Sequence, residues 1–268
     1  MDEQRDGWGG FEDPEAYQWH APPEGGSRHG WLRAHPGVVA FGVVAIAICL
    51  VLSSVAIAVT DSGSTHPSVP PNQAGYLWCC NVRDVSASWD VPLLVHQRSQ
   101  SAEAVWIGAQ TQDGTFFLQV GTNEYVSTLS SQYQAFWSDG PLNGAPQYMG
   151  TLAPGDEVHA QLAHGHGGWI VTFSDATKGW THRKHVAYTA SAANALAEWI
   201  EEDPVAVDPH GSTLFRMAVT NGTRVSGLLV NDAPPLLDAT QPEDFVDASG
   251  TRFSPTALIH DTFGFRPW

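Results

Sequence analysis

The second part of the chain, from Ala74 to Trp268, consists of short runs in which apolar and polar residues alternate. Two of these runs are residues 157–163 (EVHAQLA) and 168–174 (GWIVTFS), and the HGHGG segment between them predicts a hairpin turn. Gly, Pro, Asn or Asp interrupt the runs roughly every ten residues, and no long helical periodicity is present. Because side chains alternate between the two faces of a strand, we expect an all-β fold, a two-sheet antiparallel β-sandwich.

An uncharged run from Gly37 to Thr60 precedes this part of the chain. As a helix it would span about 36 Å at about 1.5 Å per residue, which is enough to cross a bilayer. The run begins too late and is too long for a signal peptide. Arg28 and Arg33 flank its N-terminal side and Asp61 follows it, so the positive-inside rule places the N-terminus in the cytoplasm.

These features divide the chain into four parts. Residues 1–36 are rich in Gly, Pro and acidic residues and predict a disordered cytoplasmic tail. Residues 37–60 predict a single transmembrane helix, and residues 61–73 have the Ser- and Pro-rich composition of a linker. Residues 74–268 form the expected β-sandwich domain. We therefore expect a single-pass protein of the cell membrane whose C-terminal domain is extracellular.

The charge balance narrows the possible partners. Only twelve residues are Lys or Arg, and the formal net charge is −16. Binding to nucleic acid needs clustered basic residues, so we expect no nucleic-acid partner. Carboxylates that repel one another at neutral pH become neutral in acid, so such a surface favours low pH. The simpler interpretation, that the acidity only keeps the protein soluble, stays open.

The three cysteines do not predict a disulfide framework. Cys49 lies within the apolar run, and Cys79 and Cys80 are adjacent. Neighbouring cysteines can bridge each other only through a strained eight-membered ring. The pair therefore suggests free thiols or a link between chains.

Two strand-like segments about eighty residues apart carry polar residues on predictable faces. In residues 116–121, Gln119 lies on the face opposite Leu118. In residues 197–204, Glu202 shares a face with Ile200, opposite Glu201. A carboxamide and a carboxyl can thus stand on one side of one sheet, unless Gln119 is an ordinary exposed residue and residues 201–203 a solvated strand end.

These segments and their neighbours resemble the glutamic peptidases (eqolisins), acid endopeptidases that work with one Gln and one Glu. The similarity covers most of the stretch from Gly75 to about Pro267, in the family's order. The motifs that carry it are a Trp-x-Gly strand at 105–108, Leu-Gln-x-Gly at 118–121, Tyr-x-Ala-aromatic at 133–137 and Ala-Glu-Trp-Ile-x-Glu-Asp at 197–203. Gln119 and Glu202 stand at the positions of the catalytic pair.

The resemblance implies a concanavalin-like β-sandwich that hydrolyses peptide or protein substrates. It implies Gln119 and Glu202 as catalytic residues, and no cofactor or metal ion. The aromatic residues that it implies for substrate binding are Trp106, Trp78, Tyr133 and Trp137. A Glu beside Trp106 and other apolar surface would have its pKa raised by desolvation, so that it can shuttle protons. The Gln119 carboxamide can orient the attacking water and donate a hydrogen bond to the oxyanion.

Two positions depart from the family pattern. Gln110 stands where the family commonly has Asp, and Ser138 begins a Ser-Asp-Gly-Pro segment where the family has Glu-Trp-Tyr-Pro. The acidic residues of the family at these positions orient the catalytic pair. Two functions are therefore open: a membrane-anchored acid endopeptidase, or a non-catalytic β-sandwich that binds peptide or glycan at the cell surface.

Other candidate sites have weaker support. Asp61 begins an Asp-Ser-Gly triplet like that of aspartic peptidases, but these need two such carboxylates and the chain holds no second triplet. Four histidines on neighbouring strand-like runs offer a possible zinc site, although turn and surface histidines are commoner: His164, His166, His182 and His185.

Overall fold

The computed structural model describes residues 72–94, 101–111, 116–126, 130–140, 146–187, 195–203, 205–208, 211–214, 216–217, 223–235, 240–246 and 252–267. Contacts divide the chain into Met1–Ala40 and Phe41–Trp268, and every described residue belongs to the second unit. The tail expected at 1–36, the transmembrane helix expected at 37–60 and nearly all of the linker lie outside the described residues. Within the described residues, no helix is long and apolar enough to cross a membrane.

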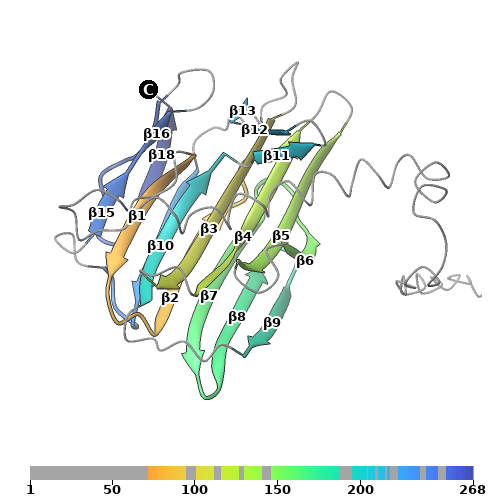
Figure 1. Ribbon diagram of the computed structural model, residues 1–268. Helices are drawn as coiled ribbons and strands as arrows, with labels where there is room; N and C mark the ends of the chain where they lie inside the picture. The colour runs from red at the N-terminus through yellow and green to blue at the C-terminus, as the bar shows by residue number, and fades with distance from the viewer. Residues whose placement is uncertain are drawn as a thin grey trace, which may run out of the picture. The chain divides into compact units, whose positions relative to one another are not determined.

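The described residues form two large sheets that lie face to face as two layers (Figure 1). The first sheet has its strands in the order β15 (Thr240–Glu243), β1 (Gln73–Cys79), β10 (Ala195–Glu202), β3 (Ser101–Thr111), β4 (Phe117–Val126), β5 (Ser131–Asp139) and β6 (Gln147–Thr151). These neighbours are antiparallel, and β13 (Arg216–Met217) adds a short parallel pairing to β3.

The second sheet has its strands in the order β16 (Phe245–Val246), β17 (Arg252–Pro255), β18 (Phe263–Pro267), β14 (Arg224–Val230), β2 (Asp84–Asp90), β7 (Glu157–Gly165), β8 (Gly168–Asp175) and β9 (Trp180–Val186). Its pairings are antiparallel. A separate two-stranded sheet, β11 (Val205–Asp208) and β12 (Gly211–Leu214), follows β10 along the chain. The predicted all-β antiparallel sandwich is confirmed.

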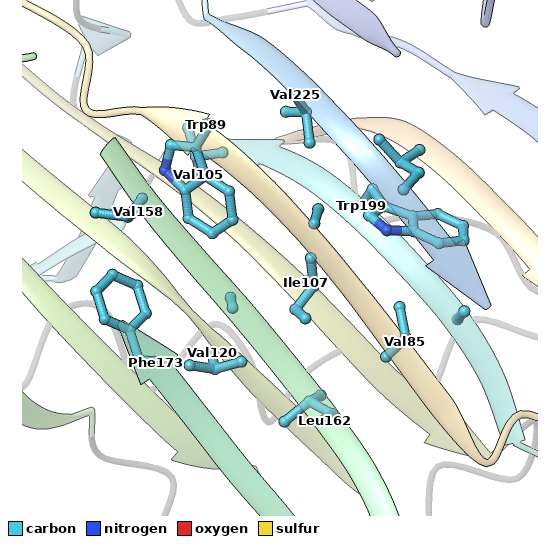
Figure 2. Close-up of a cluster of buried hydrophobic side chains, with 14 of the residues drawn as sticks. Val85, Trp89, Val105, Ile107, Val120, Val158, Leu162, Phe173, Trp199 and Val225 are labelled. Atoms are coloured by element: carbon cyan, nitrogen blue, oxygen red, sulfur yellow. The ribbon is translucent and has the colours of Figure 1, made fainter. Parts of the chain in front are cut away.

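The core lies between the two sheets. Apolar side chains from both layers meet there, as Figure 2 shows for Val105, Ile107 and Val120 of the first sheet and Trp89 and Phe173 of the second. Strand β8 shows why the sequence folds this way. Its residues Trp169, Val171 and Phe173 are buried in the core, and the residues between them are partly exposed. This alternation is the pattern of a strand with one face in a core and one toward solvent.

The central strands of the first sheet are buried on both faces. Strands β3, β4 and β10 are buried along nearly their whole length. We call the face toward the second sheet the inner face and the opposite one the outer face. A separate apolar cluster lies on the outer face and consists of Ala104, Trp106, Phe136 and Ile200, with Phe117 packed against it.

Two local expectations are settled by the fold. The hairpin predicted at His164–Gly168 is confirmed, because β7 and β8 are joined there and Gly167 has a φ of 81°. At Cys79 and Cys80, where the sequence suggested free thiols or a link between chains, the structure places the two sulfur atoms together within one chain. Strand β1 begins at Gln73, one residue before the expected domain boundary.

Candidate active site

Gln119 and Glu202 lie on the outer face of the first sheet. Strand β10 lies between β1 and β3, which places it two strands from β4 although it follows β4 by some seventy residues. Glu202 pairs with Ala104 of β3, and Gln119 pairs with Gly108 of the same strand. Paired residues share a face, as do residues an even number apart on a strand. The predicted faces of the two strands are therefore confirmed.

Hydrogen bonds from neighbouring side chains hold the Glu202 carboxyl in place. Trp106 Nε1 donates a hydrogen bond to Oε2 over 2.9 Å, and Asn72 Nδ2 donates one to Oε1 over 3.3 Å. Burial raises the pKa of Glu202 to about 7, while hydrogen bonds from Trp106, Gln73 and Asn72 lower it. The desolvation expected beside Trp106 is thus present. A carboxyl with this pKa can accept and release a proton near neutral pH, as a general base must.

The indole of Trp106 extends from Glu202 to Gly108, the residue that pairs with Gln119. While Nε1 of its indole contacts Glu202, its six-membered ring lies over Gly108: a Cβ added to that glycine would be 2.8 Å from Cζ3. A Cβ on Gly121 would be 2.5 Å from the Trp106 Cβ. Phe117 packs edge-on against the indole, with 5.8 Å between ring centroids. Both glycines are required, because a side chain at Gly108 would displace the indole and one at Gly121 would lie 2.1 Å from the carbonyl oxygen of Val105.

The Gln119 carboxamide is buried and has no partner in the described part of the chain. Its exposure is 0%, and neither Oε1 nor Nε2 makes a hydrogen bond to a described residue. Ser138, which pairs with Gln119 on β5, is equally buried, and its Oγ also has no such partner. An unpaired buried polar group costs about 1–3 kcal/mol, so these groups are ready to hydrogen-bond a ligand or water.

Glu198 is a second buried carboxyl on the outer face, and sequence reasoning missed it. It pairs with Gly108 from β10, so Glu198, Gly108, Gln119 and Ser138 form one row across four strands. Gln110 Nε2 donates a hydrogen bond to Glu198 Oε1. Burial raises the pKa of Glu198 to about 8; the bond from Gln110 lowers it and the charge of Glu202 raises it further. The sequence could have indicated Glu198, because it lies four residues before Glu202 and residues four apart on a strand share a face.

Three of the predicted substrate-binding residues lie elsewhere. Trp78, Tyr133 and Trp137 pair with residues of the inner face and pack against the core between the sheets. Of the four predicted aromatic residues only Trp106 lies on the outer face. The expectation rested on residue type within the motifs, whereas the alternation of side chains turns Trp78, Tyr133 and Trp137 away from Gln119. The aromatic residues beside Trp106 are instead Phe117 and Phe136.

The histidines considered for zinc are distributed over β7, the following turn and β9. In the described ranges, no group of three or more His, Cys, Asp or Glu residues is arranged to hold a metal ion.

Comparison with known proteins gives one family and a consistent fold. The model of the peptidase A4 family matches residues 72–225, which is more than half of the chain. Among curated proteins, none matches this sequence.

Two solved structures of similar fold are peptidases. One is the crystal structure of scytalido-glutamic peptidase with a peptide-based transition state analog, with a TM-score of 0.61 and 19% sequence identity. The matched region covers 75% of this chain and 100% of the peptidase chain. The structure of SCP-B, a member of the eqolisin family of peptidases, in a complex with the tripeptide Ala-Ile-His has a TM-score of 0.59, the same 19% identity and the same coverage. At this identity the likeness shows the fold.

Proposed function

This chain belongs to the peptidase A4 (eqolisin) family, and from that premise we propose that it is an endopeptidase in which Glu202 and Gln119 activate water. The observation that carries the proposal is the outer face itself. A carboxyl with a pKa of about 7 and a carboxamide that has no partner among the described residues share this buried surface, although about eighty residues separate them in sequence.

Each of the two residues has a defined task. The Glu202 carboxylate removes a proton from water, whose oxygen then attacks the carbonyl carbon of the substrate. The Gln119 carboxamide orients the water through its oxygen and donates an N–H to the oxyanion that develops. Trp106 and Asn72 keep the carboxylate oriented throughout, because each donates to a different oxygen.

The working pH lies on the acid side of neutral in this proposal. One unit below its pKa, about a tenth of the Glu202 side chains are ionised, so the amount of active base increases as the pH approaches 7. Glu103, Glu124 and Glu201, which are buried on the inner face, have pKa values raised by burial and therefore favour the folded state in acid. Activity is therefore limited by protonation of the base at low pH and by stability of the fold at higher pH.

The alternative of a non-catalytic sandwich that binds peptide or glycan rests on the departures at Gln110 and Ser138. Gln110 nevertheless makes a hydrogen bond to a carboxyl of the site, Glu198. Ser138 is buried beside Gln119 with no partner in the described residues, which suits contact with substrate. We retain the enzyme as the proposal, and an assay separates the two, since a binding protein would retain peptide without cleaving it.

For the location, we propose an outward-facing domain tethered by residues 37–60. The support is the uncharged run with Arg28 and Arg33 on its N-terminal side. The first residue matched by the family, Asn72, lies only twelve positions after Thr60, which leaves no room for a folded propeptide. Mass spectrometry of membrane and medium fractions tests the tether. A mature form that begins near residue 74 and is released into the medium would contradict it.

The activity is tested on the full-length protein in detergent, with an unfolded protein as substrate between pH 3 and pH 8. We expect cleavage of internal peptide bonds below neutral pH and none by the Glu202→Gln variant. Absence of cleavage by the wild type at every pH would overturn the proposal.

A further inference from the structure

The carboxyl that lies in register with Gln119 is that of Glu198. Both residues pair with Gly108, from opposite sides, so about 10 Å separates their Cα atoms at a strand spacing of about 4.8 Å. Glu202 is four residues further along β10, which is about 13 Å at 3.3 Å per residue. Glu198 and Gln119 therefore face each other across a residue that has no side chain.

The Glu198 carboxyl extends into this gap. A Cβ added to Gly108 would lie 2.8 Å from Glu198 Oε2, so the oxygen stands over the glycine, on the side of the row toward Gln119. The other oxygen, Oε1, accepts the hydrogen bond from Gln110. One oxygen is thus fixed by Gln110. The other lies over Gly108 next to the six-membered ring of Trp106, on the side toward a carboxamide whose atoms have no partner among the described residues.

We propose that Glu198 is a second catalytic carboxyl of this peptidase, which protonates the departing amine while Glu202 acts only as the base. This inference rests on the proposed function. The scissile peptide lies against the six-membered ring of Trp106, which covers Gly108, with its carbonyl oxygen toward Gln119 Nε2 and its nitrogen toward Glu198 Oε2. The proton of Glu198 is delivered to the lone pair of this nitrogen, which becomes available when the nitrogen turns pyramidal in the tetrahedral intermediate.

The protons balance in this scheme. Water adds its hydroxyl to the carbonyl carbon, and its proton passes to the Glu202 carboxylate. When the C–N bond breaks, the proton on Glu198 Oε2 passes to the nitrogen, and the bonding electron pair leaves with the amine. Glu202 is then protonated and Glu198 ionised. Exchange of one proton with solvent at each residue restores the starting state.

The order of protonation supports these roles. The pKa of Glu198 is raised to about 8 and that of Glu202 to about 7, so Glu202 loses its proton first. The described residues of the flanking strands β1 and β3 bring no further charged side chain to the outer face: they place there Gln73, Gly75, Leu77 and Cys79, and Ala102, Ala104, Trp106, Gly108 and Gln110. Glu202 is thus the charged neighbour of Glu198 on this face of the three strands.

The two carboxyls lie at different ends of the Trp106 indole, and this difference in position suits different tasks. Glu202 lies at the Nε1 end of the indole. Glu198 Oε2 lies at the other end, where this oxygen and the six-membered ring both approach Gly108. A water held by Glu202 and a nitrogen held by Glu198 would therefore reach the reacting carbonyl from different directions. A single carboxyl would have to move along the indole between the two steps.

The test compares two substrates with the same acyl peptide in full-length protein: a peptide amide and a p-nitrophenyl ester. The amine needs a proton to leave, whereas p-nitrophenolate leaves without one. We expect Glu198→Gln, which can still bond Gln110, to lower kcat on the amide ~10²–10⁴-fold, the range for general acid catalysis. On the ester it should lower kcat less than about tenfold. The control Glu202→Gln should lower kcat on both substrates, because both need the base.

Each alternative outcome is distinct. A Glu198→Gln variant that cleaves the amide at the wild-type rate would overturn the inference and leave the proposed function intact. Equal losses on amide and ester would also overturn it, since a residue that only supports the site affects both substrates alike. A wild type that hydrolyses neither substrate would overturn the proposed function and the inference with it.

Discussion

Strand β10 places buried glutamates on both faces of one sheet, in two different environments. Glu198 and Glu202 on the outer face receive hydrogen bonds from neutral donors, Gln110 to the first and Trp106 and Asn72 to the second. Glu201 on the inner face lies near Glu103 and Glu124, which pair with each other on β3 and β4. Buried glutamates thus lie beside neutral hydrogen-bond donors on the outer face and beside other carboxyls on the inner face.

The inner-face carboxyls make the fold sensitive to pH. Burial raises the pKa of Glu103 to about 7 and those of Glu124 and Glu201 well above their ordinary range, with the charge of Glu103 as the next cause for both. Thr223 donates a hydrogen bond to Glu103 over 3.0 Å, and Tyr133 pairs with Glu124 from β5. Among the described residues none of the three glutamates takes part in an ion pair. Their burial therefore favours the protonated form, and ionisation costs free energy of folding.

The comparison teaches that the groups around a buried carboxyl, neutral donors on the outer face and other carboxyls on the inner face, decide what that carboxyl does. Donors lower the pKa and hold the charged form in one orientation, which a catalytic base needs. At Glu124 and Glu201 the charge of Glu103 adds to the effect of burial, so both groups stay protonated, and their charge appears only at a cost to the folded state.

The largest expected effect comes from replacing Glu202 on β10, compared with the same replacement at its neighbour Glu201. Glu202→Gln should lower kcat/KM by up to about 10⁴-fold while the fold is kept, because it removes the base and preserves the shape. Glu201→Gln is the matched control and should stay within about threefold of wild type, because its side chain lies on the inner face. Peptide cleavage followed by chromatography measures both. More than a tenth of the activity in Glu202→Gln, or a reversal of the two variants, would contradict the comparison.

The carboxamide of the outer face should matter almost as much. Gln119→Ala should cost ~2.7–4 kcal/mol of transition-state stabilisation, as expected for an oxyanion donor, and the loss should appear in kcat rather than KM. Gln161→Ala on the second sheet, which loses a hydrogen bond to Asp84, serves as a control for the fold. An effect on KM alone would mean that Gln119 only binds substrate.

Stability should fall as pH rises, and the inner face should account for part of the fall. Glu103 binds its proton more tightly in the folded state, where its pKa is about 7 against an ordinary 4.5. Its contribution is complete below pH 4.5 and is lost as the pH rises through 7, on the order of 3 kcal/mol. Glu124 and Glu201 act in the same direction.

Removing one inner-face charge tests this linkage. Glu201→Gln should flatten the dependence of unfolding free energy on pH above 4.5 by about 1.4 kcal/mol per pH unit, with unchanged catalysis. Urea unfolding at pH 4.5, 6 and 7 measures the slope. Glu198 and Glu202 also have raised pKa values, so part of the wild-type slope should persist in the variant. A slope identical to that of the wild type would show that the Glu201 carboxyl does not contribute.

The smallest effect concerns a donor rather than a carboxyl. Trp106→Phe keeps an aromatic ring but removes the N–H that donates to Glu202, so the pKa of Glu202 should rise. A hydrogen bond to a charged group is worth about 1.5–3 kcal/mol, so the acid limb of the kcat/KM profile should move up by at least about one pH unit. An unshifted limb with a lower plateau would indicate that Trp106 acts only through packing.

Much of the fold and part of the site follow from local sequence pattern. The period of two along each strand predicts which residues share a face, and this placed Gln119 opposite Leu118 and Glu202 with Ile200 without any knowledge of the neighbouring strands. The same period offers Glu198 as a companion of Glu202, because it is four residues away on the same strand. The turn residues around His166 likewise predicted the β7–β8 hairpin.

The tertiary structure decided which faces meet, because strand order and register depend on contacts between residues distant in sequence. It inserted β10 between β1 and β3, and so set Glu198 and Gln119 on either side of Gly108. It also brought Asn72, from the expected linker, to Glu202. The aromatic residues Trp78, Tyr133 and Trp137 show the same limit: their type suited a cleft, but the packing of the second sheet on the inner face put them in the core.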